Sequence, residues 1–162
     1  MPIKQLGPYR IERTLGHGGM GSVYASIHTE TGERAAIKVL SDALAADPRF
    51  RERFHGEVET LRKLRHNNIV TLHGYGEEEG RLFFVMELVK GIPITEYCDQ
   101  HRLNSRARLE LFVSVCRAVQ HAHQKGIIHR DIKPSNVLVT LRDGVPVPKI
   151  IDFGVAKAIK HR

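Results

Sequence analysis

The residues best suited to chemistry lie late in the chain. The densest polar cluster is the run 129–136, with the sequence His-Arg-Asp-Ile-Lys-Pro-Ser-Asn, and Asp152 opens an Asp-Phe-Gly step after an apolar segment. In these segments, Asp131 and Asp152 offer carboxylates, Asn136 an amide and Lys133 an ammonium group. A carboxylate can orient or deprotonate a hydroxyl, carboxylate and amide oxygens suit Mg²⁺, and a lysine can hold a phosphate. These are the groups that phosphoryl transfer requires.

A second candidate is Lys38, which interrupts an otherwise apolar segment. A buried ammonium group without a partner is strongly unfavourable, so a carboxylate or a bound anion should meet it. The predicted helix from Asp47-Pro48 to Arg65 places Glu57 on its inward face, whereas Glu52 and Glu59 are predicted to be solvated. The apolar residues that define this face are Phe50, Phe54, Leu61 and Leu64. We expect Lys38 to pair with Glu57; a purely structural salt bridge is the alternative.

The third candidate is the Gly-x-Gly-x-x-Gly cluster formed by Gly16, Gly18 and Gly21. Dinucleotide-binding folds use the same spacing, but in them a helix follows the glycines. Here the segment 22–27 alternates with a period of two, which predicts a strand. We therefore expect the glycines to cap a β-hairpin that covers phosphates, with a merely flexible turn as the alternative.

Apolar periodicity and turn residues predict an α+β scaffold for these groups. Five strands are expected, at 9–15, 22–27, 35–40, 69–73 and 82–88, around the helix 47–65. A second helix is expected from Ser105 to Lys125, ended by Gly126. Asp143-Gly144 predicts a hairpin turn between the strands 137–139 and 145–151.

The second helix has an apolar series that we expect to be buried. Its members are Leu109, Phe112, Cys116, Val119 and His123. Cys116 and His123 are accordingly predicted to be core residues. His121 and His123 are not expected to form a metal site, because residues two apart project from different helical faces.

Composition limits the class of protein. The chain has 162 residues and a net charge of +7, and its lysines and arginines are scattered singly, so no nucleic-acid partner is expected. Cys98 and Cys116 do not form a Cys-x-x-Cys motif, so neither a zinc site nor a disulfide scaffold is predicted. No signal peptide or membrane segment is apparent, and a cytoplasmic location is expected, with an anchor outside this chain still open.

Five sequence motifs, taken together and in their order along the chain, resemble those of a known protein family. They are Leu15-Gly16-His17-Gly18-Gly19-Met20-Gly21-Ser22-Val23, Ala36-Ile37-Lys38, Glu57, the loop 129–136 and Asp152-Phe153-Gly154. In this order they resemble the first part of a protein kinase domain. The glycine loop and the run 154–157, Gly-Val-Ala-Lys, are similar to those of eukaryote-like serine/threonine kinases of bacteria.

The resemblance implies a role for each matching residue. Asp131 would accept the proton of the substrate hydroxyl, Lys133 would contact the γ-phosphate, and Lys38, held by Glu57, would contact the α- and β-phosphates. Asn136 and Asp152 would bind Mg²⁺. The residues implied to surround the nucleotide are Leu15, Gly16, Gly18, Gly21, Val23, Ala36, Lys38, Met86, Glu87, Val89 and Leu138. Met86 would be the gatekeeper, and the backbone of Glu87 and Val89 would contact adenine.

The resemblance also implies a fold and a function. The expected fold is protein-kinase-like: a flank at 1–8, a five-stranded antiparallel N-lobe with one helix at 9–86, and a hinge with an incomplete, mainly helical C-lobe at 87–162. The implied function is transfer of phosphate from ATP, with Mg²⁺ or Mn²⁺, to serine or threonine hydroxyls of a protein. A nucleotide-binding or interaction module without transferase activity is the alternative.

The chain stops eight residues after Gly154, so it lacks much of what the family pattern places later. We therefore expect an exposed apolar patch on the second helix and on the strand 145–151. Gly56, inside the first helix, is expected to weaken that helix beside Glu57.

Overall fold

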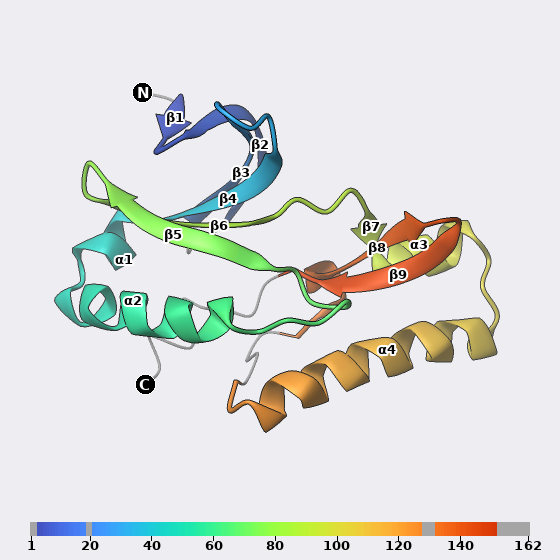
Figure 1. Cartoon of the computed structure of the whole chain (residues 1–162). Coiled ribbons are helices and arrows are strands. Elements are labelled where there is room, and N and C mark those ends of the chain that lie inside the picture. Colours follow the sequence, from blue (N-terminus) through green and yellow to red (C-terminus); the bar gives the residue numbers. More distant parts are fainter. Residues whose placement is uncertain (1–2, 19–20, 128–131, 152–162) are drawn as a thin grey trace. The chain divides into compact units, whose positions relative to one another are not determined.

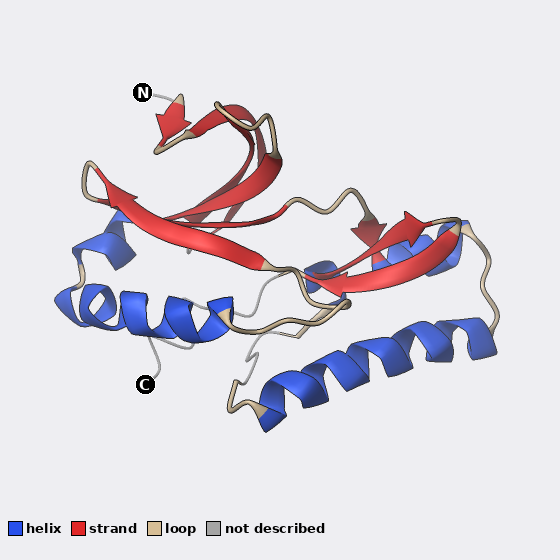
Figure 2. Ribbon diagram, viewed as in Figure 1, coloured by secondary structure: helices blue, strands red, loops and turns tan. Residues whose placement is uncertain are grey.

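The structure, a computed structural model, describes residues 3–18, 21–127 and 132–151. The chain divides into two compact units, which are considered separately below. The first unit is Met1–Lys63 with Thr71–Leu88, and the second is Leu64–Val70 with Val89–Arg162. Figures 1 and 2 show the helices and strands of both.

The first unit is built on a six-stranded sheet in the order β1-β2-β3-β4-β6-β5, in which all neighbouring strands are antiparallel. The strands are β1 (Gln5–Leu6), β2 (Tyr9–Gly18), β3 (Gly21–His28), β4 (Arg34–Leu40), β5 (Leu72–Glu78) and β6 (Arg81–Glu87). The predicted strand 69–73 is wrong in its bounds, because β5 begins at Leu72 and continues through Gly74 and Gly76. Ile69 instead forms an isolated parallel bridge with Ile150 in the second unit.

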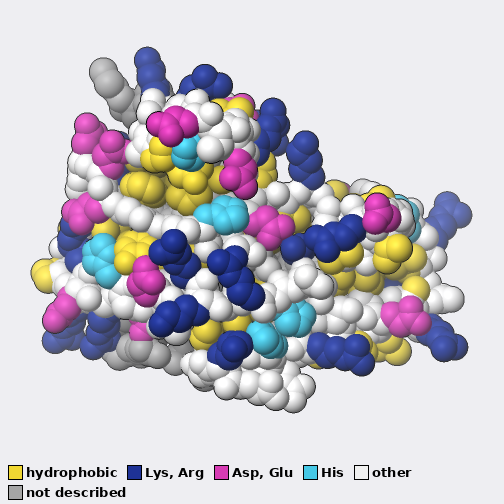
Figure 3. Space-filling model, in the orientation of Figure 1, with side chains coloured by type: hydrophobic (Ala, Val, Ile, Leu, Met, Phe, Trp, Pro, Cys, Tyr) yellow, Lys and Arg dark blue, Asp and Glu magenta, His cyan; other side chains and the backbone are white. Residues whose placement is uncertain are grey.

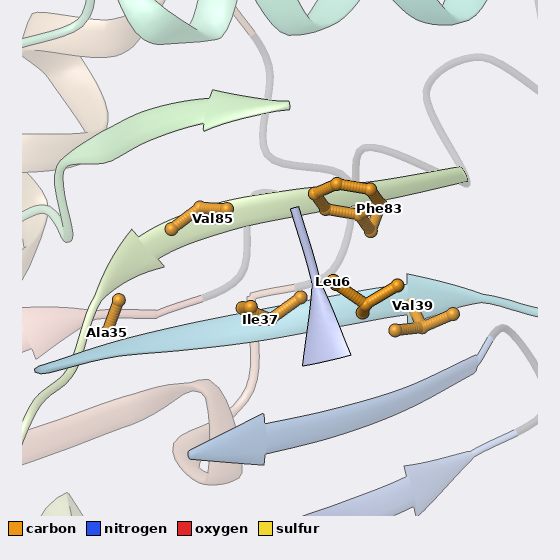
Figure 4. Close-up of a cluster of buried hydrophobic side chains, with 6 residues drawn as sticks. All are labelled: Leu6, Ala35, Ile37, Val39, Phe83 and Val85. Carbon is orange, nitrogen blue, oxygen red and sulfur yellow. The ribbon is translucent and has the colours of Figure 1, made fainter. Parts of the chain in front are cut away.

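One face of this sheet is closed by a short strand that sequence patterns did not predict. Leu6 of β1, only 2% exposed, packs with alternate residues of β4 and β6. Figure 4 shows this cluster, which consists of Leu6, Ala35, Ile37, Val39, Phe83 and Val85. The Gly7 N–H also donates to the Glu78 carboxylate over 2.8 Å. The N-terminal segment is therefore part of the core of the first unit.

Two helices complete the first unit: α1 (Asp42–Ala46) and α2 (Pro48–Arg62). The Asp47 side chain caps α2 by accepting the Arg49 N–H over 2.9 Å, and Pro48 occupies the first turn, as the sequence predicts. The helix ends three residues before the predicted Arg65. The short α1, capped by Ser41, was not predicted.

The second unit has a three-stranded sheet in the order β7-β8-β9. Its elements are β7 (Ile92–Pro93), α3 (Ile94–Gln100), α4 (Ser105–Gln124), the 3₁₀ helix η1 (Pro134–Asn136), β8 (Val137–Arg142) and β9 (Val145–Ile150). The predicted hairpin turn is confirmed, since Asp143 and Gly144 have φ values of 52° and 77°. Two consecutive positive φ values are typical of a type I′ turn. The predicted end of α4 is also confirmed, with Gly126 at φ 78°.

The predicted buried face of α4 is wrong. The helix packs beside β9 and buries Leu111, Val115, Ala118 and Ala122. Leu109 and Phe112 are 60% and 58% exposed, and Cys116 and His123 are exposed as well. Both series have helical spacing, but α4 buries the one with the smaller side chains, which permits close packing on the hairpin.

The expected apolar patch is confirmed on α4, where Leu109, Phe112 and Val113 form an exposed group. On β9 the expectation holds only at the first residue, because Val145 is 59% exposed whereas Pro148, Lys149 and Ile150 are buried.

Charged side chains are distributed widely over the surface. In the view of Figure 3, lysine and arginine side chains occur with acidic, histidine and apolar side chains between them. Among the described residues, no helix has both the length and the apolar character needed to cross a membrane.

Candidate active site

The glycine cluster forms the end of the β2–β3 hairpin. Gly18 lies opposite Gly21, and a strand, not a helix, follows the glycines, so the prediction of a hairpin is confirmed. Residues 19–20 lie outside the described residues. Across the hairpin, His17 Nδ1 is 2.7 Å from Ser22 Oγ, within hydrogen-bonding distance.

The three glycines of the motif differ in what the fold requires of them. Gly21 has a φ of 146°, and a Cβ there would lie 2.1 Å from the Val39 carbonyl oxygen. Glycine is therefore needed at this position for the close approach of β3 to β4. At Gly16 and Gly18, a Cβ would meet no heavy atom within 4 Å. The packing of the chain does not require glycine there, and the backbone at these two positions is open to approach.

Four residues predicted to surround a nucleotide share one face of the first unit's sheet. Val23 lies opposite Lys38, and Ala36 lies opposite Met86. Directly opposed residues of antiparallel strands point to the same face, and so do residues two apart in one strand. These four side chains therefore lie on the face opposite the Leu6 cluster of Figure 4. Lys38 is half-buried, as expected for an ammonium group within an apolar strand.

Glu57 lies in the middle of α2, but the predicted buried face of that helix needs correction. The fully buried residues of the helix are Phe50, Phe54 and Val58, whereas Leu61 and Glu57 are half-buried. The centre of the buried face therefore lies at Phe54 and Val58. With 3.6 residues per turn, Glu57 lies at one flank of this face, not at its centre.

The other flank of α2 is fixed to β5. The ring of Tyr75 packs edge-on against Phe54, with ring centroids 5.9 Å apart, and at 5.2 Å from His55. Desolvation, and then the neighbouring Glu59 carboxylate, raises the pKa of Tyr75, while Arg62 acts in the opposite direction. Glu59 is a surface charge, as predicted: its side chain is 45% exposed and lies 3.4 Å from the Arg62 guanidinium.

The first turn of α2 is attached to the same strand. Arg51 forms an ion pair with Glu77 of β5 and donates to the Ala45 carbonyl over 2.9 Å. No local pattern could have predicted the ion pair, because Arg51 and Glu77 are 26 positions apart and both also suit a solvated surface.

The remaining predicted nucleotide contacts of the first unit lie on its strands. Leu15 is 41% exposed on β2, and Met86 is buried near the end of β6. The Glu87 N–H donates to the Thr71 carbonyl over 2.9 Å, and the Thr71 N–H donates to the Glu87 carboxylate over 3.2 Å. These bonds fix the backbone where β6 ends.

In the second unit, the segment 132–151 carries the other described candidates. Lys133 is exposed just before η1, and its carbonyl accepts the Asn136 N–H over 2.9 Å. Asn136 is 9% exposed, and its carbonyl accepts the Ile151 N–H over 2.9 Å. The chain that leads to position 152 therefore lies directly beside Asn136.

The last two candidates of this unit are Val89 and Leu138, and both are half-buried. Leu138 on β8 lies opposite Pro93 on one side and Lys149 on the other. Gly91, close to Val89, approaches β8 so closely that a Cβ would lie 2.5 Å from the Val139 carbonyl oxygen. The catalytic candidate Asp131 and the metal-ligand candidate Asp152 lie outside the described residues.

The second unit also contains a histidine pair that the sequence did not reveal. The rings of His66 and His121 are 5.1 Å apart, and His66 Nδ1 accepts the Asn68 N–H over 3.0 Å. His121 Nε2 is buried and has no hydrogen-bond partner among the described residues. Burial, and then repulsion by His121, lowers the pKa of His66. The described residues contain no group of three or more metal-ligating side chains.

Comparison with known proteins relates these features to a family. The sequence model described as "Protein kinase domain" matches residues 9–162. Serine/threonine-protein kinase PknA of Mycobacterium tuberculosis is 42% identical over 159 residues, which cover 94% of this chain and 36% of that protein. Serine/threonine-protein kinase Pkn1 of Myxococcus xanthus is 38% identical over 152 residues, covering 93% of this chain and 22% of that protein. The chain thus spans about a third or less of these relatives.

Solved structures give the same result. The crystal structure of the Mycobacterium tuberculosis PknI kinase domain has a TM-score of 0.78 and 36% identity, covering 93% of this chain and 61% of that one. The crystal structure of Rad53 1-466 in complex with AMP-PNP has a TM-score of 0.78 and 32% identity, covering 91% of this chain and 38% of that one. The expected protein-kinase-like α+β fold is confirmed.

Proposed function

Because this chain belongs to the protein kinase family, whose members use ATP and a divalent metal ion, we propose that it carries the ATP site and the catalytic loop of a serine/threonine kinase. In the proposed reaction, the bond between the γ-phosphorus and the β-phosphate oxygen breaks, and a bond to a serine or threonine oxygen forms. The hydroxyl proton passes to Asp131, and ADP leaves.

The nucleotide half of the site is proposed to lie on the sheet of the first unit. The observation that carries the proposal is that Val23, Ala36, Lys38 and Met86 share one face, beside a glycine hairpin whose backbone is open at positions 16 and 18. On this reading Lys38 contacts the α- and β-phosphates. A phosphate bound there would also explain why an ammonium group occurs within an apolar strand, because the anion stabilises its charge.

Glu57 is proposed to orient Lys38, and the remaining contacts follow the family pattern. Gly16, Gly18 and Gly21 would bring backbone N–H groups to the phosphates. Adenine would lie against apolar side chains and meet the backbone of Glu87, at the end of β6, and of Val89. The residues concerned are Leu15, Val23, Ala36, Met86, Glu87, Val89 and Leu138.

The transfer half is proposed to lie in the segment 131–152. Asp131 would orient the hydroxyl and accept its proton, and Lys133 would neutralise charge on the γ-phosphate. Asn136 and Asp152 would bind Mg²⁺, for which Mn²⁺ could substitute; the ion neutralises the phosphates when bound. The hydrogen bond from the Ile151 N–H to the Asn136 carbonyl supports this assignment, because it places the residue that precedes Asp152 beside Asn136. An amide and a carboxylate are suitable oxygen donors for such an ion.

The same proposal assigns residues 9–86 to an N-lobe, to whose sheet the flank 1–8 adds the short strand β1, and 87–162 to the hinge and the first part of a C-lobe. The protein partner is proposed to present a serine or threonine, and no nucleic acid is required for the reaction.

Nucleotide binding is tested by calorimetry with ATP and Mg²⁺. Lys38→Met should weaken ATP binding at least about tenfold, because the phosphates lose a charge-assisted contact. Lys63→Met, which removes an exposed lysine at the end of α2, is the matched control and should leave binding unchanged. Equal affinities for the two variants would contradict the placement of the phosphates at Lys38.

Phosphate transfer to a generic basic protein is tested in parallel. Asp131→Asn should lower turnover by about 10² or more and leave ATP binding largely intact. Asp143→Asn, in the β8–β9 turn, is the control, since asparagine also adopts the positive φ found there. ATP binding without any transfer by the unmodified chain would favour the alternative, a nucleotide-binding module.

A further inference from the structure

A single guanidinium group joins the first turn of α2 to its neighbours in the first unit. Arg51 Nη1 donates to the Ala45 carbonyl of α1 over 2.9 Å and lies 3.5 Å from the Gly80 carbonyl oxygen in the β5–β6 turn. Arg51 Nη2 forms the ion pair with Glu77 of β5. Arginine suits this position because its planar fork can reach several acceptors at once. One side chain therefore connects α1, α2 and the β5–β6 hairpin.

A ring contact one turn later continues this attachment along β5. Arg51 and His55 are one helical turn apart, about 6 Å along the axis. Their partners Glu77 and Tyr75 are two strand residues apart, about 7 Å. The His55 and Tyr75 rings are 5.2 Å apart, so the ion pair and the ring contact follow one another at matching intervals. Helix α2 therefore runs antiparallel along β5, as Figure 1 shows.

The sheet face that α2 covers is the one that carries Lys38. Lys38 on β4 lies opposite Phe84 on β6, and Phe84 lies opposite Tyr75 on β5. Directly opposed residues of antiparallel strands point to the same face. Tyr75 and Lys38 therefore share a face, and Phe54 of α2 packs on it at Tyr75.

Arg51 and Glu57 lie on opposite flanks of the buried face of α2. This face is centred near Phe54, between the two. At about 100° per residue, Arg51 lies about 60° to one side of Phe54 and Glu57 about 60° to the other. Both are half-buried. A rotation of the helix about its axis that displaces one flank therefore displaces the other.

We infer that Arg51 is a positioning residue for Glu57. It holds the first turn of α2 to α1 and to the β5–β6 hairpin, which fixes the rotation of the helix about its own axis. Glu57, on the opposite flank, is thereby kept directed toward Lys38. The inference rests on the proposed roles of Lys38 and Glu57 and adds a residue outside the proposed contacts with nucleotide and substrate.

The first test measures the attachment by amide hydrogen exchange of α2 in the full chain. Arg51→Met keeps much of the aliphatic stem and removes the guanidinium. Amides of residues 52–62 should then exchange about 3- to 10-fold faster, because opening of the helix no longer breaks the ion pair and the bond to the Ala45 carbonyl.

Arg49→Met is the matched control for this exchange experiment. Arg49 is an exposed arginine of the same first turn, so both variants lose a cation near the helix N-terminus. Exchange in Arg49→Met should be no faster than in the parent chain. Unchanged rates in Arg51→Met, or equal acceleration in the two variants, would overturn the inference.

A double-mutant cycle shows how much of the attachment acts through Glu77. Glu77→Leu removes the ion pair and leaves the bond from Arg51 to the Ala45 carbonyl, so it should accelerate exchange less than Arg51→Met does. The Arg51→Met/Glu77→Leu double variant should exchange about as fast as Arg51→Met alone. Additive effects would overturn the inference, since the two side chains would then act independently.

The second test separates positioning from structural support by calorimetry with ATP and Mg²⁺. Arg51→Met should weaken ATP binding about threefold or more in the unmodified background and have no further effect in a Glu57→Gln background. An unchanged affinity, or the same loss in both backgrounds, would show that Arg51 only supports the fold and would overturn the positioning role.

Lys38→Met and Glu57→Gln, each measured alone, report on the proposed function. An unchanged affinity in Lys38→Met would contradict the proposed nucleotide site, and an unchanged affinity in Glu57→Gln would contradict the role of Glu57 and the positioning role with it. A loss in both variants without a loss in Arg51→Met would overturn the positioning role alone. Failure of the two proposals can therefore be distinguished.

Discussion

Alanine substitution of the three motif glycines tests which of them the fold requires and which only the proposed nucleotide site requires. In Gly21→Ala, the new Cβ would lie 2.1 Å from the Val39 carbonyl oxygen and 3.0 Å from the Leu40 Cα. Ordinary van der Waals contact begins near 3.4 Å, so the two backbones must separate by more than 1 Å. Neither obstacle can rotate away, because both are backbone atoms of β4.

The size of the effect follows from two terms. An alanine at a φ of 146° is strained, which costs about 1–3 kcal/mol, and separation of β3 from β4 adds to this. Because Gly21 begins β3 and Leu40 ends β4, opening the pair at the strand ends limits the damage. We therefore expect a total loss of about 2–4 kcal/mol of unfolding free energy, or about 4–16 °C in melting temperature for a chain of 162 residues.

Thermal unfolding of three alanine variants measures their stability, and ATP titration measures their nucleotide affinity. Gly21→Ala should lower the melting temperature, whereas Gly16→Ala and Gly18→Ala should leave it unchanged or raise it slightly, since alanine reduces the freedom of the unfolded chain. The latter two should nevertheless weaken ATP binding, because their Cβ atoms occupy space proposed for phosphates. The reasoning is refuted if Gly21→Ala melts with the parent chain, or if Gly16→Ala and Gly18→Ala destabilise the fold as much as Gly21→Ala.

Three further predictions concern stability and surface. Gly56→Ala should raise the unfolding free energy by about 0.5–1 kcal/mol in urea titrations, because the site has room for a Cβ; a loss of stability would contradict this. The pKa of His66 is lowered on folding from 6.5, so its contribution to stability is complete above pH 6.5 and is lost as the pH falls through the lower folded value. His66→Asn should therefore make the melting temperature fall less between about pH 7 and pH 5 than it does in the parent chain. Equal decreases in the two chains would argue against this assignment. The double variant Leu109→Gln/Phe112→Gln should bind less hydrophobic dye than the parent chain and melt at no lower temperature, because both side chains are exposed. Little dye binding by the parent chain would count against an exposed apolar patch.

Local signals predicted several elements because the causes of those elements are local. The cap of α2 needs only Asp47 and Pro48, and the β8–β9 turn needs only Asp143 and Gly144, so neighbouring residues determine each structure. The strand after the glycines is also a local feature, since a period of two cannot be satisfied by a helix. These predictions needed no knowledge of distant parts of the chain.

The predictions that failed depend on contacts between distant segments. On α4, the series with Leu109 and Phe112 and the series with Leu111 and Val115 both fit a helical face, and only packing on β9 selects the second. The two-residue strand at Gln5–Leu6 is too short to show any period, and its burial results from β4 and β6. Pattern and propensity cannot supply such information, because it is created by tertiary contact.

The site shows the same division between local and distant causes. The motif residues were found because their types and order resemble a family, whereas Tyr75 was not, since a tyrosine in a strand is ordinary at that position. The ring of Tyr75 nevertheless packs against Phe54 and His55 of α2 and so joins β5 to the helix that carries Glu57. Contacts of this kind are created when distant segments pack together, so no local pattern in the sequence could have indicated them.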